Sequence, residues 1–163
     1  MIQVLMFDLG MTLSDGNNRP FPHVTDALKS IAKIKTTAGK SLKSCLVSDF
    51  TMPSLGHTVN QLFDEYLAIL DTTTLRSFFE PVKKRVTLST HAGVMKPDRK
   101  VFQKALDRLG SQAALKNCLF ITENSDHVKV VRSKLHMQAL QFGKDFNDWS
   151  QASAIIAHIV ASA

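Results

Sequence analysis

Six polar residues follow short apolar runs of the sequence, and together they could carry out phosphate or carboxylate chemistry. An aspartate ends the run "IQVLMF", and a threonine lies four residues after it. A serine and an aspartate follow "CLV", a lysine stands in "HAGVMKPD", and a glutamate follows "CLFIT". The set offers a carboxylate nucleophile, hydroxyl donors, a cation and a second carboxylate. These residues are Asp8, Thr12, Ser48, Asp49, Lys96 and Glu123.

The hydrophobic pattern shows which elements would position these residues. Five apolar runs have the length and polar boundaries of strands buried on both faces: residues 3–7, 44–47, 85–88, 119–122 and 137–142. Apolar residues at helical spacing predict five helices between and after these strands. They begin near Val24, cover residues 57–70, follow Asp98, follow Ser125 and cover about 148–160. The alternation predicts an α/β fold, a doubly wound, mostly parallel five-stranded sheet with helices on both faces.

Local signals refine the ends of these helices. Asp98 is expected to cap the helix after it and Gly110 to end that helix, while Asp126 is expected to cap the helix after Ser125. Trp149 is assigned to the packing face of the final helix. In a parallel sheet, ligands bind at the carboxyl ends of the strands, so we expect the six polar residues to converge there.

Four stretches also resemble a known family. They are "VLMFDLGMTL", "LVSDF", "GVMKPDRKVFQKALDRLG" and "LFITENSDHVKV", and their order covers nearly the whole chain. They are similar to the four ordered motifs of the haloacid dehalogenase-like (HAD) superfamily. The third is the most specific match. The resemblance implies a Rossmann-like HAD core.

The resemblance also implies roles for individual residues. Asp8 would be the nucleophile and form an aspartyl intermediate, and Thr12 would position its loop. Ser48 and Lys96 would bind and neutralise the transferring group, with Asp49 either a substrate ligand or a structural hydrogen-bonding group. Mg²⁺ would be held by Asp8, by the carbonyl of Gly10 and by Glu123.

Two departures from the family pattern bear on activity. Phosphatases of this family usually have a second Asp, the general acid and base, where this chain has Gly10. Losing such a group typically costs about 10²–10⁴-fold in rate, most of all for leaving groups that must be protonated. Glu123 stands in place of an Asp, and magnesium tolerates poor geometry badly. His127 lies where many relatives carry Asn or Asp, and we interpret it as a surface helix residue rather than a metal ligand.

The segment between the first motif and the first helix, residues 14–22, is too short for the cap domain that many relatives insert there. A large second cap after Phe50 is not expected either. An open site suits a phosphorylated small molecule, a macromolecular substrate, or closure by another subunit through oligomerisation.

Composition limits the class of protein. The 163 residues are predicted to form one domain, 1–163, with no membrane span and no secretory signal. Cys45 and Cys118 lie in apolar runs, which favours reduced thiols and a cytoplasmic location. The net charge of +6 is compatible with an anionic partner, including nucleic acid. The basic residues are dispersed, however, and few aromatics accompany them.

Three functional hypotheses remain open from the sequence. The leading one is a capless, magnesium-dependent HAD-like phosphatase or phosphotransferase that uses Asp8, impaired by Gly10. The second is a catalytically silent HAD fold that serves as a binding or scaffold protein. The third is a 2-haloacid dehalogenase-type hydrolase, since a halide leaves without a proton.

Overall fold

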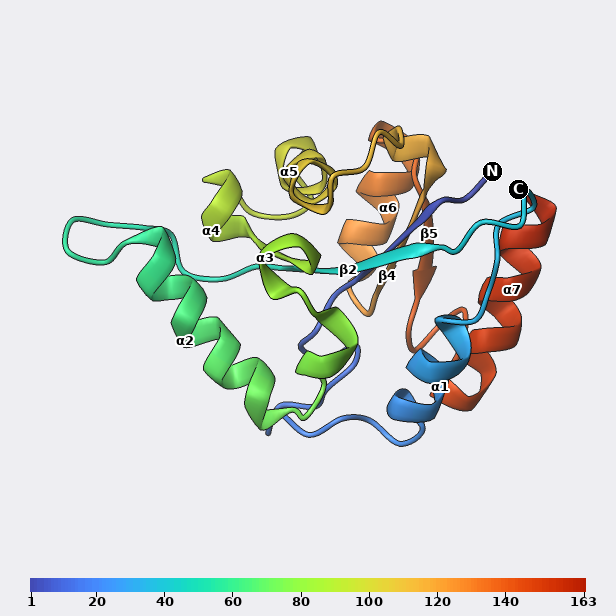
Figure 1. The fold of residues 1–163 in the computed structure, drawn as a ribbon, viewed down its shortest axis with the longest axis horizontal. Coiled ribbons are helices and arrows are strands. Elements are labelled where there is room, and N and C mark those ends of the chain that lie inside the picture. Colours follow the sequence, from blue (N-terminus) through green and yellow to red (C-terminus); the bar gives the residue numbers. More distant parts are fainter.

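A computed structural model describes all of residues 1–163 and shows a parallel sheet between layers of helices (Figure 1). The strands are β1 (Val4–Phe7), β2 (Lys43–Ser48), β3 (Val86–Leu88), β4 (Cys118–Thr122) and β5 (Gln138–Gln141). Their order is β3-β2-β1-β4-β5, and every pairing is parallel. The predicted fold class and all five predicted strands are confirmed, and the sheet is wholly rather than mostly parallel.

Seven helices and three short 3-10 turns connect the strands. The helices are α1 (Val24–Ile31), α2 (Val59–Thr72), α3 (Val82–Arg85), α4 (Ser89–Ala92), α5 (Arg99–Leu109), α6 (Ser125–Lys134) and α7 (Ala152–Ser162). The turns are η1 (Arg76–Phe79), η2 (Leu115–Asn117) and η3 (Trp149–Gln151). Residues 8–23, between β1 and α1, contain no helix, so the predicted absence of a cap at this place is confirmed.

The predicted caps are right for α5 and wrong for α6. Asp98 accepts a hydrogen bond from the backbone N–H of Lys100 at 2.8 Å, and Gly110 ends the helix at a positive φ of 65°. At α6 the cap is Asn124, whose side chain accepts from the backbone N–H of His127 at 3.0 Å. Asp126 already lies in the first turn, where a negative charge favours the positive end of the helix dipole.

Alternation along the strands builds two hydrophobic cores, one on each face of the sheet. In β1, Leu5 and Phe7 pack with α1, α2 and α7, whereas Val4 and Met6 pack with α5 and α6. In Figure 1, α1 and α7 lie together on one side of the sheet, and α2 stands at the opposite end of the molecule. The period of two in a strand is therefore what sorts neighbouring residues between the two layers.

Two sequence expectations concern residues outside the sheet edges. Cys45 and Cys118 are free and buried, as predicted, and burial raises the pKa of each thiol to about 12. Trp149 is buried in η3, the turn just before α7, rather than on the last helix itself. No helix of the chain is long and apolar enough to span a membrane.

His91 in α4 makes the stability depend on pH. Its Nδ1 accepts the backbone N–H of Leu88 at 2.9 Å, and its ring meets that of Phe63 edge-on. Burial, followed by the nearby charges of Arg108 and Lys104, lowers the pKa of His91 from 6.5 to about 4. The unfolded chain therefore takes up a proton at His91 below pH 6.5, while the folded chain does so only near pH 4.

We expect the folded chain to lose about 2 kcal/mol of stability through His91 as the pH falls between these two values, after discounting for partial exposure. The His91→Gln variant keeps an acceptor for Leu88 but cannot be protonated, so its stability should fall less. Urea unfolding of both proteins at pH 7 and pH 4.5 measures the difference. Equal losses in the two proteins would contradict this role of His91.

Candidate functional site

A cavity of about 320 Å³ opens at the carboxyl ends of the strands. Six of the residues singled out from the sequence line it, and they come from the end of β2 and from the loops that follow β1, β2, α4 and β4. They are Asp8, Gly10, Ser48, Asp49, Lys96 and Glu123. Thr12 is buried and does not line the cavity. The structure thus brings the predicted residues to one place, and their roles in binding and catalysis stay predictions.

Asp8 is held between two neighbouring strands. Phe7 pairs with Leu46 of β2 and with Ile121 of β4, so the next residue lies level with Val47 and Thr122. The backbone N–H of Asp8 donates to the carbonyl of Ile121 at 3.0 Å and extends the ladder by one bond. The Oγ1 hydroxyl of Thr122 donates to Asp8 Oδ2 at 3.0 Å. The parallel register alone therefore places a hydroxyl beside this carboxylate.

Lys96 forms a buried ion pair with Asp8. Its side chain is 2% exposed, and Nζ donates to Asp8 Oδ1 at 2.8 Å and to the carbonyl of Val47 at 2.7 Å. Asp49 Oδ1 accepts the backbone N–H of Lys96 at 2.8 Å, and Asp49 also lines the cavity, so its role as a substrate ligand stays a prediction. A buried cation requires such partners, because an unpaired charge is costly to remove from water.

Glu123 is anchored through Thr12. Thr12 Oγ1 donates to Glu123 Oε2 at 2.6 Å and accepts the backbone N–H of Glu123 at 3.0 Å. The indole N–H of Trp149 donates to the carbonyl of Thr12 at 2.9 Å. Burial raises the pKa of the Glu123 carboxyl, and the neighbouring Asp8 carboxylate raises it further, against the hydrogen bond from Thr12. Two carboxyl groups thus share a partly buried space.

The residues present fit a magnesium ion with a small protein ligand set. No group of three or more His, Cys, Asp or Glu side chains lies close enough to hold a metal. Magnesium, however, usually takes one or two carboxylates and keeps several waters. Asp8 and Glu123 supply two carboxylates, and the carbonyl of Gly10 takes part in no hydrogen bond. Burial chiefly raises the pKa of Glu123 and repulsion from Asp8 adds to it, and a cation would relieve that repulsion.

Ser48 has a partner that the sequence analysis did not foresee. Its hydroxyl lies 2.6 Å from the hydroxyl of Tyr66, a buried residue of α2. Ser48 has the same strand parity as Leu46, which packs in the core of the α2 face, so its side chain is directed toward that helix. Contact between Ser48 and a phosphate therefore remains a prediction in which Tyr66 would take part.

The sequence analysis did not assign three residues to the candidate site that the structure places there. Thr122 and Tyr66 were assigned only to a strand and to an apolar helix stripe, although a hydroxyl in either pattern is a recognisable signal. His127 was interpreted as a surface residue, but it is half-buried and lines the cavity. Its Nδ1 is buried without a hydrogen-bond partner, and burial together with the charge of Lys96 lowers its pKa. The imidazole is therefore neutral at pH 7.

Removing the cation of the ion pair should destabilise the protein. Lys96→Met leaves the Asp8 and Glu123 carboxylates without a buried positive partner, and we expect the free energy of unfolding to fall by about 3 kcal/mol. Lys100→Met, at an exposed position four residues away, removes the same charge and should cost about 0.5 kcal/mol or less. Urea unfolding of both variants tests this. Equal stabilities would show that the ion pair does not hold the site together.

Comparison with solved structures supports the fold. No protein-family model matches the sequence, and no curated protein matches it. An uncharacterized protein from Corynebacterium glutamicum aligns with a TM-score of 0.59 at 15% identity, over 98% of this chain and 96% of its own. L-2-haloacid dehalogenase from Xanthobacter autotrophicus gives 0.63 at 14% identity, over 99% of this chain and 85% of its own.

The HAD-hydrolase YfnB from Bacillus subtilis, in a magnesium-bound form, gives a TM-score of 0.62 at 12% identity. The match covers 85% of this chain and 57% of YfnB. Two of these three proteins carry HAD-type names, and their folds match nearly the whole of this chain. The resemblance noted from the motifs and the tertiary structure agree, and the chain has the fold of the haloacid dehalogenase-like hydrolases.

Proposed function

We propose that the protein is a magnesium-dependent phosphatase or phosphotransferase that uses Asp8 as its nucleophile. The observation that carries this proposal is the Asp8 carboxylate, held at 2.8 Å against the buried ammonium of Lys96 on the wall of an open cavity. The ion pair orients the carboxylate of the nucleophile, and the ammonium places a positive group beside an arriving phosphate.

The absence of an acid at position 10 favours one class of substrate. An oxygen of Asp8 would attack phosphorus, the bond from phosphorus to the leaving oxygen would break, and water would later hydrolyse the aspartyl-phosphate. Gly10 supplies no proton to the leaving group. An acyl phosphate leaves as a carboxylate and needs none, whereas an alkoxide does. Substrates with acidic leaving groups are therefore favoured.

Magnesium would be held by the carboxylates of Asp8 and Glu123 and by the carbonyl of Gly10. When bound, it would neutralise charge that develops on the transferring phosphoryl group. Thr12 and Trp149 would keep Glu123 in place for this purpose, since they connect it to the loop that carries Asp8. The bound magnesium of YfnB supports this part of the proposal.

The test is phosphate release from acetyl phosphate and from a panel of phosphomonoesters, with and without magnesium. We expect magnesium-dependent hydrolysis that is greatest for acetyl phosphate and is abolished in Asp8→Asn. Asp26→Asn, on the exposed first turn of α1, is the matched control and should retain full activity. No release from any substrate would favour the silent scaffold, and chloride release from 2-haloacids would favour the dehalogenase.

Gly10→Asp should restore the missing acid and base. A Cβ added at Gly10 would meet no atom within 4 Å, and the residue does not have a positive φ, so the backbone accepts a side chain there. We expect hydrolysis of alkyl phosphates to rise about 10²-fold, with a smaller change for acetyl phosphate. Gly16→Asp has equal space, adds the same charge and should change neither rate. An unchanged ratio of the two substrates would contradict the assigned role of position 10.

A further inference from the structure

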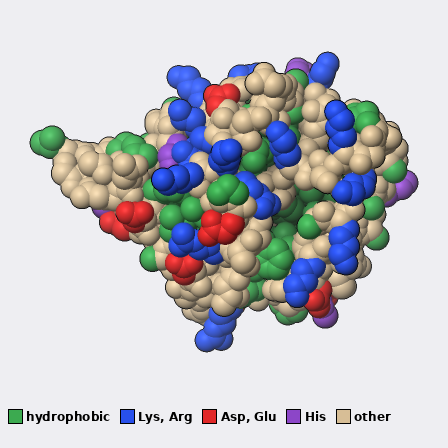
Figure 2. All heavy atoms as spheres, viewed as in Figure 1, with side chains coloured by type: hydrophobic (Ala, Val, Ile, Leu, Met, Phe, Trp, Pro, Cys, Tyr) green, Lys and Arg blue, Asp and Glu red, His purple; other side chains and the backbone are tan.

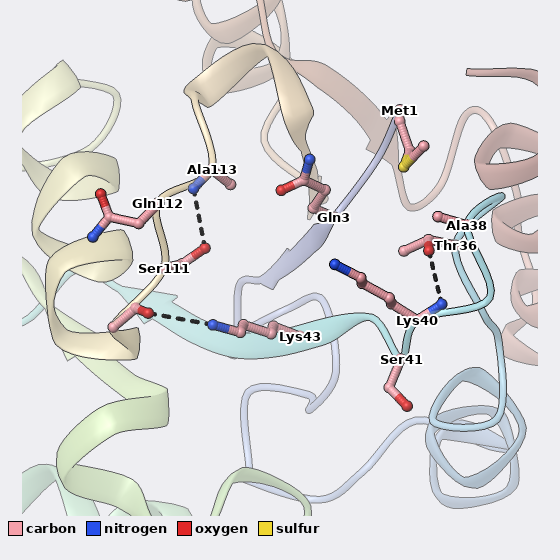
Figure 3. Close-up of a pocket in the computed structure, with 11 residues that line it drawn as sticks. Met1, Gln3, Thr36, Ala38, Lys40, Ser41, Lys43, Ser111, Gln112 and Ala113 are labelled. Atoms are coloured by element: carbon pink, nitrogen blue, oxygen red, sulfur yellow. Dashed lines mark hydrogen bonds between the residues drawn. The ribbon is translucent and has the colours of Figure 1, made fainter.

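A second cavity lies at the opposite edge of the sheet from the candidate site. Its volume is about 570 Å³, and it opens where the strands begin, beside Gln3 of the segment before β1 and Lys43 of β2. The segments 36–41 and 110–113 close its sides (Figure 3). This volume is within the range of small-ligand pockets, about 300–1,000 Å³.

The lining of this cavity is cationic. Lys40 and Lys43 both line it, and no Asp or Glu does. Lys43 Nζ donates to the carbonyl of Gly110 at 3.3 Å, which holds it across the floor. Figure 3 shows the Lys40 side chain reaching into the space between Gln3 and Lys43, and its ammonium has no hydrogen-bond partner. Two ammonium groups therefore face a space without a counter-charge.

The surrounding edge carries most of the net charge of the protein. The four segments that lead into β2, β3, β4 and β5 are residues 32–43, 81–85, 110–117 and 134–137, and they contain no acidic residue. They contain nine basic ones: Lys33, Lys35, Lys40, Lys43, Lys83, Lys84, Arg85, Lys116 and Lys134. Figure 2 shows Lys and Arg spread over the whole visible face, with few Asp or Glu on the half of the molecule where both termini lie.

Helix ends account for only part of this distribution, since Lys83, Lys84, Arg85 and Lys134 lie in the last turns of α3 and α6. Basic residues favour the last turn of a helix, but the segment from 32 to 43 lies outside any helix and holds four lysines. The nearby acids Asp71 and Glu80 do not neutralise it, because both are paired with Arg76 at 3.1 and 3.0 Å. The positive charge at this edge is therefore available to a ligand.

We propose that this cavity binds a small ligand that carries one or more phosphate groups. Charged donors form the strongest hydrogen bonds to phosphate oxygens, and the lining adds polar groups at Gln3, Ser41, Ser111 and Gln112. No aromatic residue lines the cavity, which argues against stacking of nucleic-acid bases. The only large exposed apolar side chain at this edge is that of Met1, so a lipid surface would find a single apolar contact there.

The test uses inorganic pyrophosphate without magnesium, followed through the amide resonances of the ¹⁵N-labelled protein. We expect saturable shifts of residues 36–43 and 110–113. Lys40→Gln combined with Lys43→Gln should weaken this binding about tenfold or more. Lys83→Gln combined with Lys84→Gln removes the same charge from the same edge but not from the cavity, and should weaken it less than about threefold.

Three outcomes would overturn the proposal. Equal losses in the two double variants would show that only diffuse charge is involved. Shifts confined to the loop around Asp8 would assign the binding to the candidate site at the other edge. Tighter binding of a mixed-sequence single-stranded RNA, weakened equally by both double variants, would identify the edge as a nucleic-acid surface. Because the two cavities report through different amides, this test is independent of the proposed hydrolase activity.

Discussion

The buried ion pair between Lys96 and Asp8 is the interaction on which the candidate site depends. A lysine with 2% of its side chain exposed is stable only if its ammonium finds anionic or carbonyl partners. Those partners are Asp8, directly after β1, and Val47 of β2, while the backbone of Lys96 is bound by Asp49 and leads into α5. The pair therefore connects two central strands to the α5 layer, and it keeps Asp8 oriented toward the cavity.

The strand register supplies the remaining geometry. Because β1 pairs in parallel with both β2 and β4, the residue after Phe7 lies beside Thr122 on one side and Val47 on the other. The alternation of side chains then directs Asp8 toward α5 and α6, and Ser48 toward α2. A slip of one residue in this register would separate Asp8 from its hydroxyl and carbonyl neighbours.

The sheet edge where the strands begin and the sheet edge where they end differ in charge because all five strands are parallel. In a parallel sheet, every segment that follows a strand lies at one edge, and every segment that precedes a strand lies at the other. The four segments that lead into β2 to β5 hold nine of the 20 basic residues and no acidic one, whereas Asp8, Asp49 and Glu123 directly follow strands. The net charge is only +6, yet the cavity at one edge is lined by carboxylates and the cavity at the other edge is lined by lysines.

Much of the fold and part of the site could be predicted from the sequence, because those features depend on neighbours along the chain. The five apolar runs became the five strands, and the cap and stop of α5 are local hydrogen-bonding choices of Asp98 and Gly110. The convergence of Asp8, Lys96 and Glu123 followed from the parallel topology. The wrong cap at α6 reflects two candidates only two residues apart, Asn124 and Asp126, that the local pattern does not separate.

Only the tertiary structure decided which groups are buried together. The bond between Ser48 and Tyr66, the burial of His127 against the site and the support of Thr12 by Trp149 join segments far apart in the sequence. The lysines looked dispersed for the same reason, since their segments meet only when the strands align. The contacts of these polar side chains and the local density of charge depend on segments that meet only in the packed chain, so no single stretch of residues could have predicted them.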